Sequence, residues 1–317
     1  LGRTLLGPRL TSLHPALRYS MQSATGLLAV STVVWAQMLL GVSRASLLAL
    51  TGLMAVIGGV ELWRWVRART RPRTRRELAE RVGFILGGLW VAWVAAAAAL
   101  PPTGLDERLD HREVPGRGLE AGRFVPCTDH GYAFFPQGGD ALLLLGLGVA
   151  GETAARLFHG LCAMLTGLAV YGAARSQVGA VPSLLGAAAY LTVPTGLVIA
   201  SWAYVDHHFA LYAFLAVTAV ERLLRAWHEA DDGRILRWAV IAGVMAGGAW
   251  TSKYTGLQLT LLLCAVVLID VLRGPRKGVP VRALALPAIA FLFFSPYLLR
   301  HLWMTGWPLY PFAIGPF

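Results

Sequence analysis

Long apolar runs, each close to twenty residues, recur along this 317-residue sequence and limit its fold more than any other feature. A helix needs about 20 apolar residues to cross the hydrocarbon core of a bilayer. The composition agrees, because 56% of the residues are hydrophobic and 14% are charged, whereas soluble domains carry about a quarter charged residues. We therefore predict an all-α fold, a polytopic bundle of transmembrane helices.

The apolar runs predict nine spans. They lie near residues 24–42, 47–63, 82–100, 153–173, 178–200, 203–225, 236–251, 254–272 and 281–299. A further apolar run, Asp140–Gly151, is too short to cross a bilayer, and we interpret it as a re-entrant or interfacial piece.

The segment Arg64–Arg81 holds eight arginines and two glutamates and predicts the orientation. Basic loops stay on the cytoplasmic side, so the next span runs outward and residues 101–151 form a long extracytoplasmic loop. The net charge of +11 is concentrated in such short segments. It therefore indicates topology in a bacterial-type inner membrane and contact with bilayer lipids, not nucleic-acid binding.

This threading brings ionisable residues from distant segments to the predicted outer face. A carboxylate at the membrane boundary can act as a general base on an incoming acceptor, and Lys or Arg can bind a phosphate. The pattern fits transfer from a lipid-phosphate donor to an acceptor that arrives from outside. The residues are Asp106, Glu107, Asp110 and His111, then Asp206, His207 and His208, then Lys253, and finally Arg300 and His301.

Several stretches in order resemble the GT-C class of membrane glycosyltransferases, and within it the protein O-mannosyltransferase and aminoarabinose-transferase group. They are "PPTGLDERLDH", "GLEAGRF", "GYAFFPQGGD", "AYVD" ending at Asp206, "SKYTG" and "SPYLLRHLWMTGWPLYPF". The resemblance covers residues 82–317. It implies a GT-C-like helical bundle, a polyprenyl-phosphate-linked sugar as donor, and direct displacement at the anomeric carbon.

The resemblance also implies roles for particular residues. Asp106 corresponds to the general base, and Glu107 and Asp206 are further acidic candidates for the catalytic site. Lys253 and Arg300 are expected to contact the donor phosphate, with a divalent metal ion left open as a cofactor and no metal ligands assigned. The remaining substrate-binding candidates are Tyr204, Tyr254, Tyr310 and His111.

We expect two parts: residues 1–81 as an N-terminal two-span segment and residues 82–317 as the GT-C-like core. Two features depart from the family pattern. Asp110 and His111 stand where members commonly have a Tyr-His pair, and the chain stops at "PFAIGPF", where relatives continue, so the C-terminal part of the pattern is expected to be missing.

Other interpretations stay open at this stage. Asp106 and Glu107 could cap a short helix as solvated loop charges. Cys127, Asp129, His130 and His111 could hold a metal, although their spacing fits no standard zinc pattern. The whole chain could be a non-catalytic subunit that packs against other membrane proteins, or a lipid transporter or flippase. The last would need internal repeats, which the sequence does not show.

Overall fold

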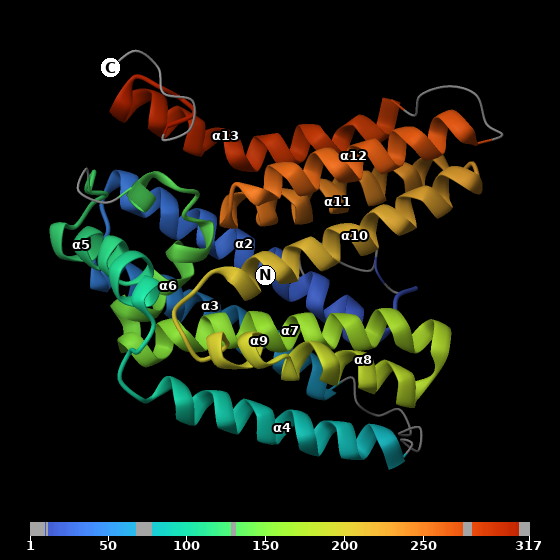
Figure 1. The fold of residues 1–317 in the computed structure, drawn as a ribbon, viewed down its shortest axis with the longest axis horizontal. Coiled ribbons are helices and arrows are strands. Elements are labelled where there is room, and N and C mark those ends of the chain that lie inside the picture. The colour runs from blue at the N-terminus through green and yellow to red at the C-terminus, as the bar shows by residue number, and fades with distance from the viewer. Residues whose placement is uncertain (1–9, 11, 68–77, 128–130, 275–280, 311–317) are drawn as a thin grey trace. The chain divides into compact units, whose positions relative to one another are not determined.

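In the described part of the chain every regular element is helical, which confirms the predicted fold class (Figure 1). The computed structural model describes all residues except 1–9, 11, 68–77, 128–130, 275–280 and 311–317. The α-helices are α2 (Pro15–Leu40), α3 (Arg44–Arg67), α4 (Leu78–Ala98), α5 (Glu113–Ala121), α6 (Gly138–Ala150), α7 (Glu152–Val178), α8 (Ala180–Thr192), α9 (Pro194–Ile199), α10 (Asp206–His228), α11 (Asp232–Ser252), α12 (Thr255–Arg273) and α13 (Ala285–Thr305). Tighter or wider turns occupy Glu107–His111, Gly131–Phe134 and Val281–Leu284.

Six of the described helices are long and apolar enough to cross a membrane. They are α2, α3, α4, α7, α12 and α13, and each overlaps one of the predicted spans. This supports an integral membrane protein but does not confirm the predicted count of nine. The direction in which each helix crosses stays a prediction.

The three remaining predicted spans correspond to α8 with α9, to α10 and to α11. The span at 178–200 is divided into α8 and α9, because Pro194 begins a new helix after the extended residue Val193. Helix α10 carries Asp206 at its start and Glu221, Arg222 and Arg225 near its end, and α11 buries most of its residues inside the protein. Helix α6 has 13 residues, about 20 Å at 1.5 Å per residue, which agrees with the prediction that this run does not span.

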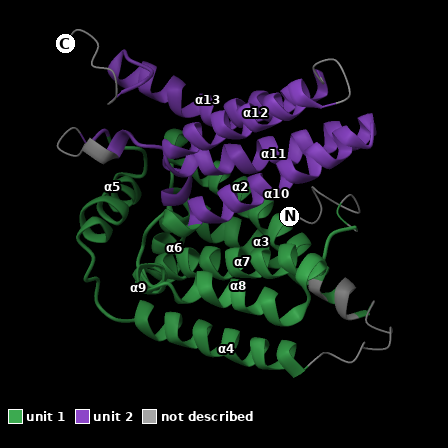
Figure 2. Cartoon of the chain, turned by 45° about the vertical axis from the view of Figure 1, so that its right-hand side comes forward, with its two compact units in different colours: residues 1–125, 141–207 green, residues 126–140, 208–317 purple. Residues whose placement is uncertain are grey.

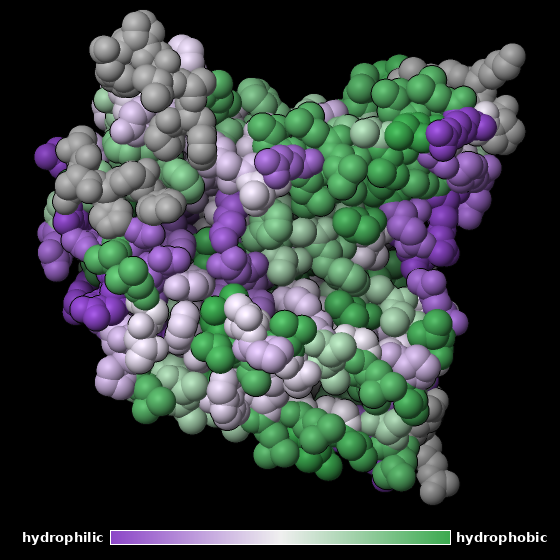
Figure 3. Space-filling view, in the orientation of Figure 1, coloured by the Kyte–Doolittle hydropathy of each residue, from purple (hydrophilic) through white to green (hydrophobic). Residues whose placement is uncertain are grey.

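Large apolar side chains lie exposed along the candidate spans. On α4 they include Phe84, Ile85 and Leu89, which are 60–64% exposed, and on α12 Leu261 and Leu262, both 61% exposed. Figure 3 shows hydrophobic side chains in green over the visible surfaces of these helices. Such continuous apolar surface is costly in water and is what lipid tails accept.

The chain divides into two compact units, which Figure 2 colours separately. Unit 1 contains residues 1–125 and 141–207, and unit 2 contains residues 126–140 and 208–317. The chain therefore passes between the units three times, entering unit 2 at residue 126, returning to unit 1 at residue 141 and entering unit 2 again at residue 208. The expected division into residues 1–81 and 82–317 stays a proposal.

Helix α7 is the centre of unit 1, because α2, α4 and α8 all pack against it. Glycines permit these close approaches. A Cβ on Gly146 of α6 would lie 2.5 Å from the Cα and N atoms of Ala155, and one on Gly172 would meet the backbone of Leu17. The turn between α6 and α7 is made at Gly151, whose φ of +80° suits glycine.

Helix α11 is the centre of unit 2, where it packs against α12 and α13. Gly248 on α11 lies directly under the ring of Tyr212 from α10, and Gly256 on α12 lies against the backbone of Trp250. Small residues allow this packing in membrane bundles, where dispersion replaces the hydrophobic driving force.

Much of the predicted outer loop is helical. After the turn Glu107–His111, helix α5 ends at Gly122, which adopts the left-handed conformation. The chain beyond it is tied to the α2–α3 turn, since Val42 N–H donates to Gly122 O (2.7 Å) and Phe124 N–H donates to Met38 O (2.5 Å).

These contacts predict opposite effects for two glycine substitutions within helices. Gly146→Ala should destabilise the protein by about 1–3 kcal/mol, because its methyl group meets the backbone of α7. Gly88→Ala on α4 meets no atom within 4 Å and should be neutral or slightly stabilising. Thermal unfolding in detergent measures both, and a Gly146→Ala protein that melts with the wild type would contradict the α6–α7 contact.

Candidate active site

Asp106, Glu107 and Asp110 lie at or directly before one π-helical turn of unit 1, Glu107–His111. Asp106 precedes this turn with helical backbone angles and an exposed side chain, and it makes no capping hydrogen bond. Glu107 begins the turn and is 1% exposed. A wide turn of this kind redirects neighbouring side chains and often occurs at functional sites. Two adjacent carboxylates therefore have different surroundings, one at the surface and one buried.

Glu107 is buried in an ion pair with Arg156 of α7. Its Oε1 atom accepts from Arg156 Nε at 2.6 Å and from the backbone N–H of Ala203 at 2.9 Å. Arg156, 4% exposed, also donates to the carbonyls of Ala98 and Leu100 at the end of α4. Burying a carboxylate and a guanidinium is costly unless they pair with each other, and here Oε1 of Glu107 and the guanidinium of Arg156 are both hydrogen-bonded. The pair holds α4, α7 and the π-helical turn together.

Glu107 also lines a small hollow within unit 1. Glu107 Oε2 is buried and has no hydrogen-bond partner among the described residues. The hollow has room for about one water molecule, and His111, Glu152, Arg156 and Ala203 also line it. A buried carboxylate oxygen without a donor is costly. The second oxygen of this carboxylate is therefore a polar group that the ion pair leaves unsatisfied.

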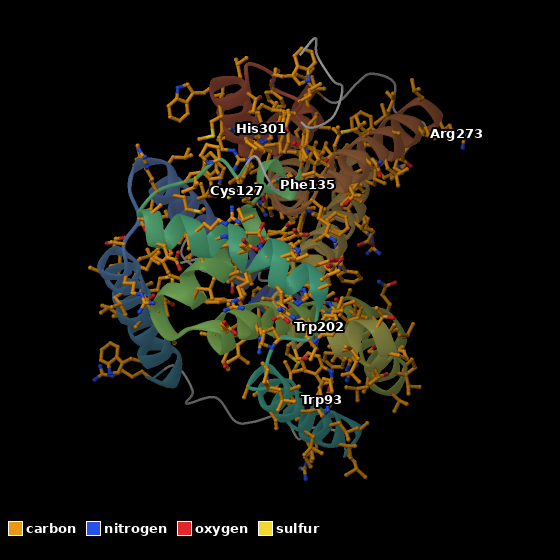
Figure 4. All side chains as sticks on the ribbon, turned by 60° about the vertical axis from the view of Figure 1, so that its left-hand side comes forward. Trp93, Cys127, Phe135, Trp202, Arg273 and His301 are labelled. Atoms are coloured by element: carbon orange, nitrogen blue, oxygen red, sulfur yellow. The ribbon has the colours of Figure 1, made fainter. Side chains whose placement is uncertain are left out.

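Tyr204 lies against the same turn. Its ring centre is 5.4 Å from that of His111 and 5.5 Å from that of Trp202. Trp202, labelled in Figure 4, also packs where Gly104 leaves room for its ring. A tyrosine phenol ionises only well above neutral pH. The phenol therefore stays protonated at neutral pH and can donate a hydrogen bond.

Asp206 is in the first turn of α10 and is half-buried. A carboxylate is favoured there, because the unpaired N–H groups of a helix N-terminus carry partial positive charge. The structure thus collects five of the predicted site residues in unit 1: Asp106, Glu107, His111, Tyr204 and Asp206.

The other four predicted residues belong to unit 2, where Arg300 organises its surroundings. Arg300 is 3% exposed and donates to Gln137 Oε1 at 2.5 Å and to the carbonyls of Phe134 and Phe135 at 3.3 Å. Its guanidinium also lies 2.8 Å from His301 Nε2. Figure 4 shows Phe135 close to His301. These bonds give Arg300 a bracing role for residues 134–137, and its predicted contact with phosphate stays a prediction.

Tyr254 and Tyr310 are joined in unit 2, since the Tyr254 hydroxyl donates to Tyr310 O at 3.2 Å. The ring of Tyr310 meets Phe134 edge-on at 4.8 Å, and that of Tyr254 meets Phe135 at 5.4 Å. A tyrosine phenol is protonated at neutral pH, so the Tyr254 hydroxyl remains a donor. Lys253, half-buried at the C-terminal cap of α11, precedes Tyr254 directly.

Sequence reasoning missed Arg156, Gln137 and Ser252. An arginine inside the apolar run of α7 was a visible signal, because a charge at membrane depth needs a partner. Ser252 lies 2.6 Å from His208 Nδ1, a contact that no local pattern indicates. The described residues contain no group of three metal-binding side chains, and the considered ligands Asp129 and His130 lie outside them.

The comparisons with known proteins now identify the family. The sequence model of the dolichyl-phosphate-mannose-protein mannosyltransferase family matches residues 140–300, which is 161 of the 317 residues. The chain belongs to this family. It is therefore a glycosyltransferase-family membrane protein of the GT-C type, as the ordered motifs predicted. Neither the curated proteins nor the solved structures gave a match.

The part matched to the mannosyltransferase family contains Tyr204, Asp206, Lys253, Tyr254 and Arg300. The segment with Asp106, Glu107 and His111 precedes it, and Tyr310 follows it. Arg156, however, lies within the matched part and binds Glu107 directly. The predicted acidic turn is thus physically attached to the family core, through a residue that the sequence analysis had not selected.

The Glu107–Arg156 pair predicts a strong effect of removing the cation. Arg156→Met should destabilise the protein by about 3–5 kcal/mol, since it leaves a buried carboxylate without its counter-charge. The control is Arg117→Met, which removes a pair with Glu113 whose side chains are about one-third exposed and should cost less than about 1 kcal/mol. Unfolding in detergent compares them, and equal losses would show that the buried pair is not special.

Proposed function

We propose that the protein transfers a sugar from a polyprenyl-phosphate donor to an acceptor at the extracytoplasmic face of a bacterial-type inner membrane. Family membership supports a glycosyltransferase, and the family's description supports a lipid-phosphate mannose as donor and a protein as acceptor. The proposal rests on the observation that the two adjacent carboxylates, Asp106 and Glu107, have different surroundings. Asp106 stays at the surface while its neighbour Glu107 is fixed in an internal ion pair.

In this proposal Asp106 is the general base. It takes the proton of the acceptor hydroxyl while the acceptor oxygen forms a bond to the anomeric carbon. The bond from that carbon to the phosphate oxygen breaks, and its electron pair leaves on the lipid phosphate. A positioned carboxylate suits this role because it needs only hydrogen-bond reach and a base strength matched to the step.

The remaining residues have supporting roles. Glu107 positions the turn, and His111 beside it lines the same hollow. Asp206 is a second acidic group, and Tyr204 provides a pocket wall and a hydroxyl donor. Lys253, with Arg300 or a divalent metal ion, offsets the charge that develops on the departing phosphate. Tyr254 and Tyr310 form a second aromatic wall.

The capping interpretation of the acidic pair is less well supported. Asp106 makes no capping hydrogen bond, and the Glu107 carboxylate accepts from an arginine and from the distant amide of Ala203. Solvated loop charges that cap a helix would not have a buried carboxylate with these partners. These contacts favour a site in which one carboxylate is held so that the other is presented.

The first test replaces the proposed base. Asp106→Asn should lower turnover by about 10²–10⁴-fold, the usual contribution of general-base catalysis, with the fold unchanged because the side chain is exposed. The measurement is transfer of labelled mannose from polyprenyl-phosphate mannose in liposomes, to a threonine-rich peptide or to water. Asp110→Asn, four residues on, is the control and should retain activity.

Two outcomes would contradict the proposal. Full activity of Asp106→Asn would exclude this residue as the base. An inactive wild type that co-purifies in fixed stoichiometry with other membrane proteins would instead favour the non-catalytic subunit, and movement of the intact lipid without sugar transfer would favour the flippase.

A second test addresses the donor phosphate. Lys253→Gln should raise KM for the lipid donor by about tenfold or more, because a hydrogen bond to a charged group contributes about 1.5–3 kcal/mol. Arg273→Gln is the control, since Arg273 is in the last turn of α12 and Figure 4 shows it away from His301. An unchanged KM in Lys253→Gln would remove this lysine from the donor site.

A further inference from the structure

A buried histidine on α7, His159, holds the segment that carries Tyr204 and Asp206. Its side chain is 2% exposed. Nδ1 lies 2.9 Å from the carbonyl of Ile199 and 3.0 Å from that of Trp202, and Nε2 accepts from the backbone N–H of His207 at 2.8 Å. One imidazole thus binds both ends of residues 199–207.

These contacts determine the proton positions on the ring. A carbonyl oxygen can only accept, so Nδ1 carries the hydrogen, and a backbone N–H can only donate, so Nε2 carries a lone pair. His159 is therefore the neutral Nδ1–H tautomer. A second proton would turn the contact with His207 into two opposed N–H groups and would place a positive charge at the positive end of α10.

The contact with His207 also substitutes for a missing helix cap. The first N–H groups of a helix have no partner within the helix, and Val205, which precedes α10, has no side-chain acceptor. His159 supplies the acceptor from a different helix. The position at which α10 begins, and with it the position of Asp206, then depends on α7.

A second histidine completes the arrangement with the opposite tautomer. His207 Nε2 lies 2.8 Å from the carbonyl of Gly196 and therefore carries the hydrogen, while Nδ1 lies 2.8 Å from the hydroxyl of Tyr190. The His159 and His207 rings lie 4.8 Å apart, and His159 also lies 6.4 Å from the ring of Tyr204. Helices α8, α9 and α10 are thereby tied to one residue of α7.

We propose that His159 is a positioning residue, which as a neutral imidazole fixes residues 199–207 and thereby sets the Tyr204 ring and the Asp206 carboxylate for sugar transfer. The consequence for transfer rests on the proposed function, whereas the fixing of the segment does not. His159 reaches the reaction only through these residues, because its ring is buried and both of its nitrogens are bound to backbone groups.

Three variants of His159 distinguish the effect of its hydrogen bonds at Nδ1 and Nε2 from the effect of packing of its ring. His159→Phe keeps the ring and loses both bonds. His159→Gln can place an acceptor near the Nε2 position, and His159→Asn can place a donor near the Nδ1 position. The control is His228→Phe, because His228 is an exposed histidine at the other end of α10 that pairs with Asp270.

Hydrogen–deuterium exchange measures how well the backbone amides of residues 199–208 are protected in the purified protein, with no substrate present. His159→Phe should accelerate exchange in residues 199–208 at least tenfold, and the control should not. The amide of His207 should stay protected in His159→Gln and lose protection in His159→Asn, because only the former retains an acceptor. If residues 199–208 of His159→Phe exchange as slowly as in the wild type, the proposal is overturned. If His159→Phe does not fold, wild-type protection of the His207 amide in His159→Asn would overturn it.

The kinetic arm measures mannose transfer by the same proteins. His159→Phe should lower kcat by about tenfold to a hundredfold, the usual effect of misplacing a site by an ångström, with a smaller change in KM and partial recovery in the Asn and Gln variants. If exchange changes as expected but the wild type itself transfers no sugar, the positioning role stands and the proposed function fails. If the wild type is active and His159→Phe exchanges faster in residues 199–208 but keeps the wild-type kcat, the role of His159 in sugar transfer is overturned.

Discussion

A buried charge has to be satisfied inside the protein, and unit 1 is built around one such requirement. Arg156 stands in the apolar helix α7, where an unpaired guanidinium would cost several kcal/mol. It is satisfied by Glu107 and by the carbonyls that end α4. The same carboxylate also accepts the amide of Ala203. One polar contact therefore fixes the end of a helix, the π-helical turn and the segment before α10.

Unit 2 meets the same requirement in a different way. Arg300 is equally buried, and its hydrogen bonds go to the carbonyls of Phe134 and Phe135 and to the amide of Gln137. The cation thereby orders the "FFPQG" segment against α13. In both units an arginine inside an apolar helix holds an irregular segment that carries candidate site residues. Membrane proteins tolerate irregular backbone at depth only when its polar groups are bound in this way.

Helix α7 combines two such functions on one face. Arg156 and His159 are three residues apart, so they project from neighbouring positions on the helix, one toward the π-helical turn and the other toward residues 199–207. The exposed Asp106 is adjacent to Glu107, and the half-buried Asp206 is adjacent to His207, so each lies next to a residue that α7 binds. Catalytic groups are commonly presented by loops that a rigid scaffold positions.

The amino-acid sequence by itself determined the all-α membrane class, six of the spans and the family, because hydrophobic length and ordered motifs are local properties. It did not determine that the run at 178–200 is divided at Pro194, or that α11 is a core helix, since these depend on what packs against them. Nor did it distinguish Asp106 from Glu107, which are adjacent and chemically alike. Only the tertiary structure decided that Glu107 is buried, because its partners Arg156 and Ala203 come from positions 49 and 96 residues away.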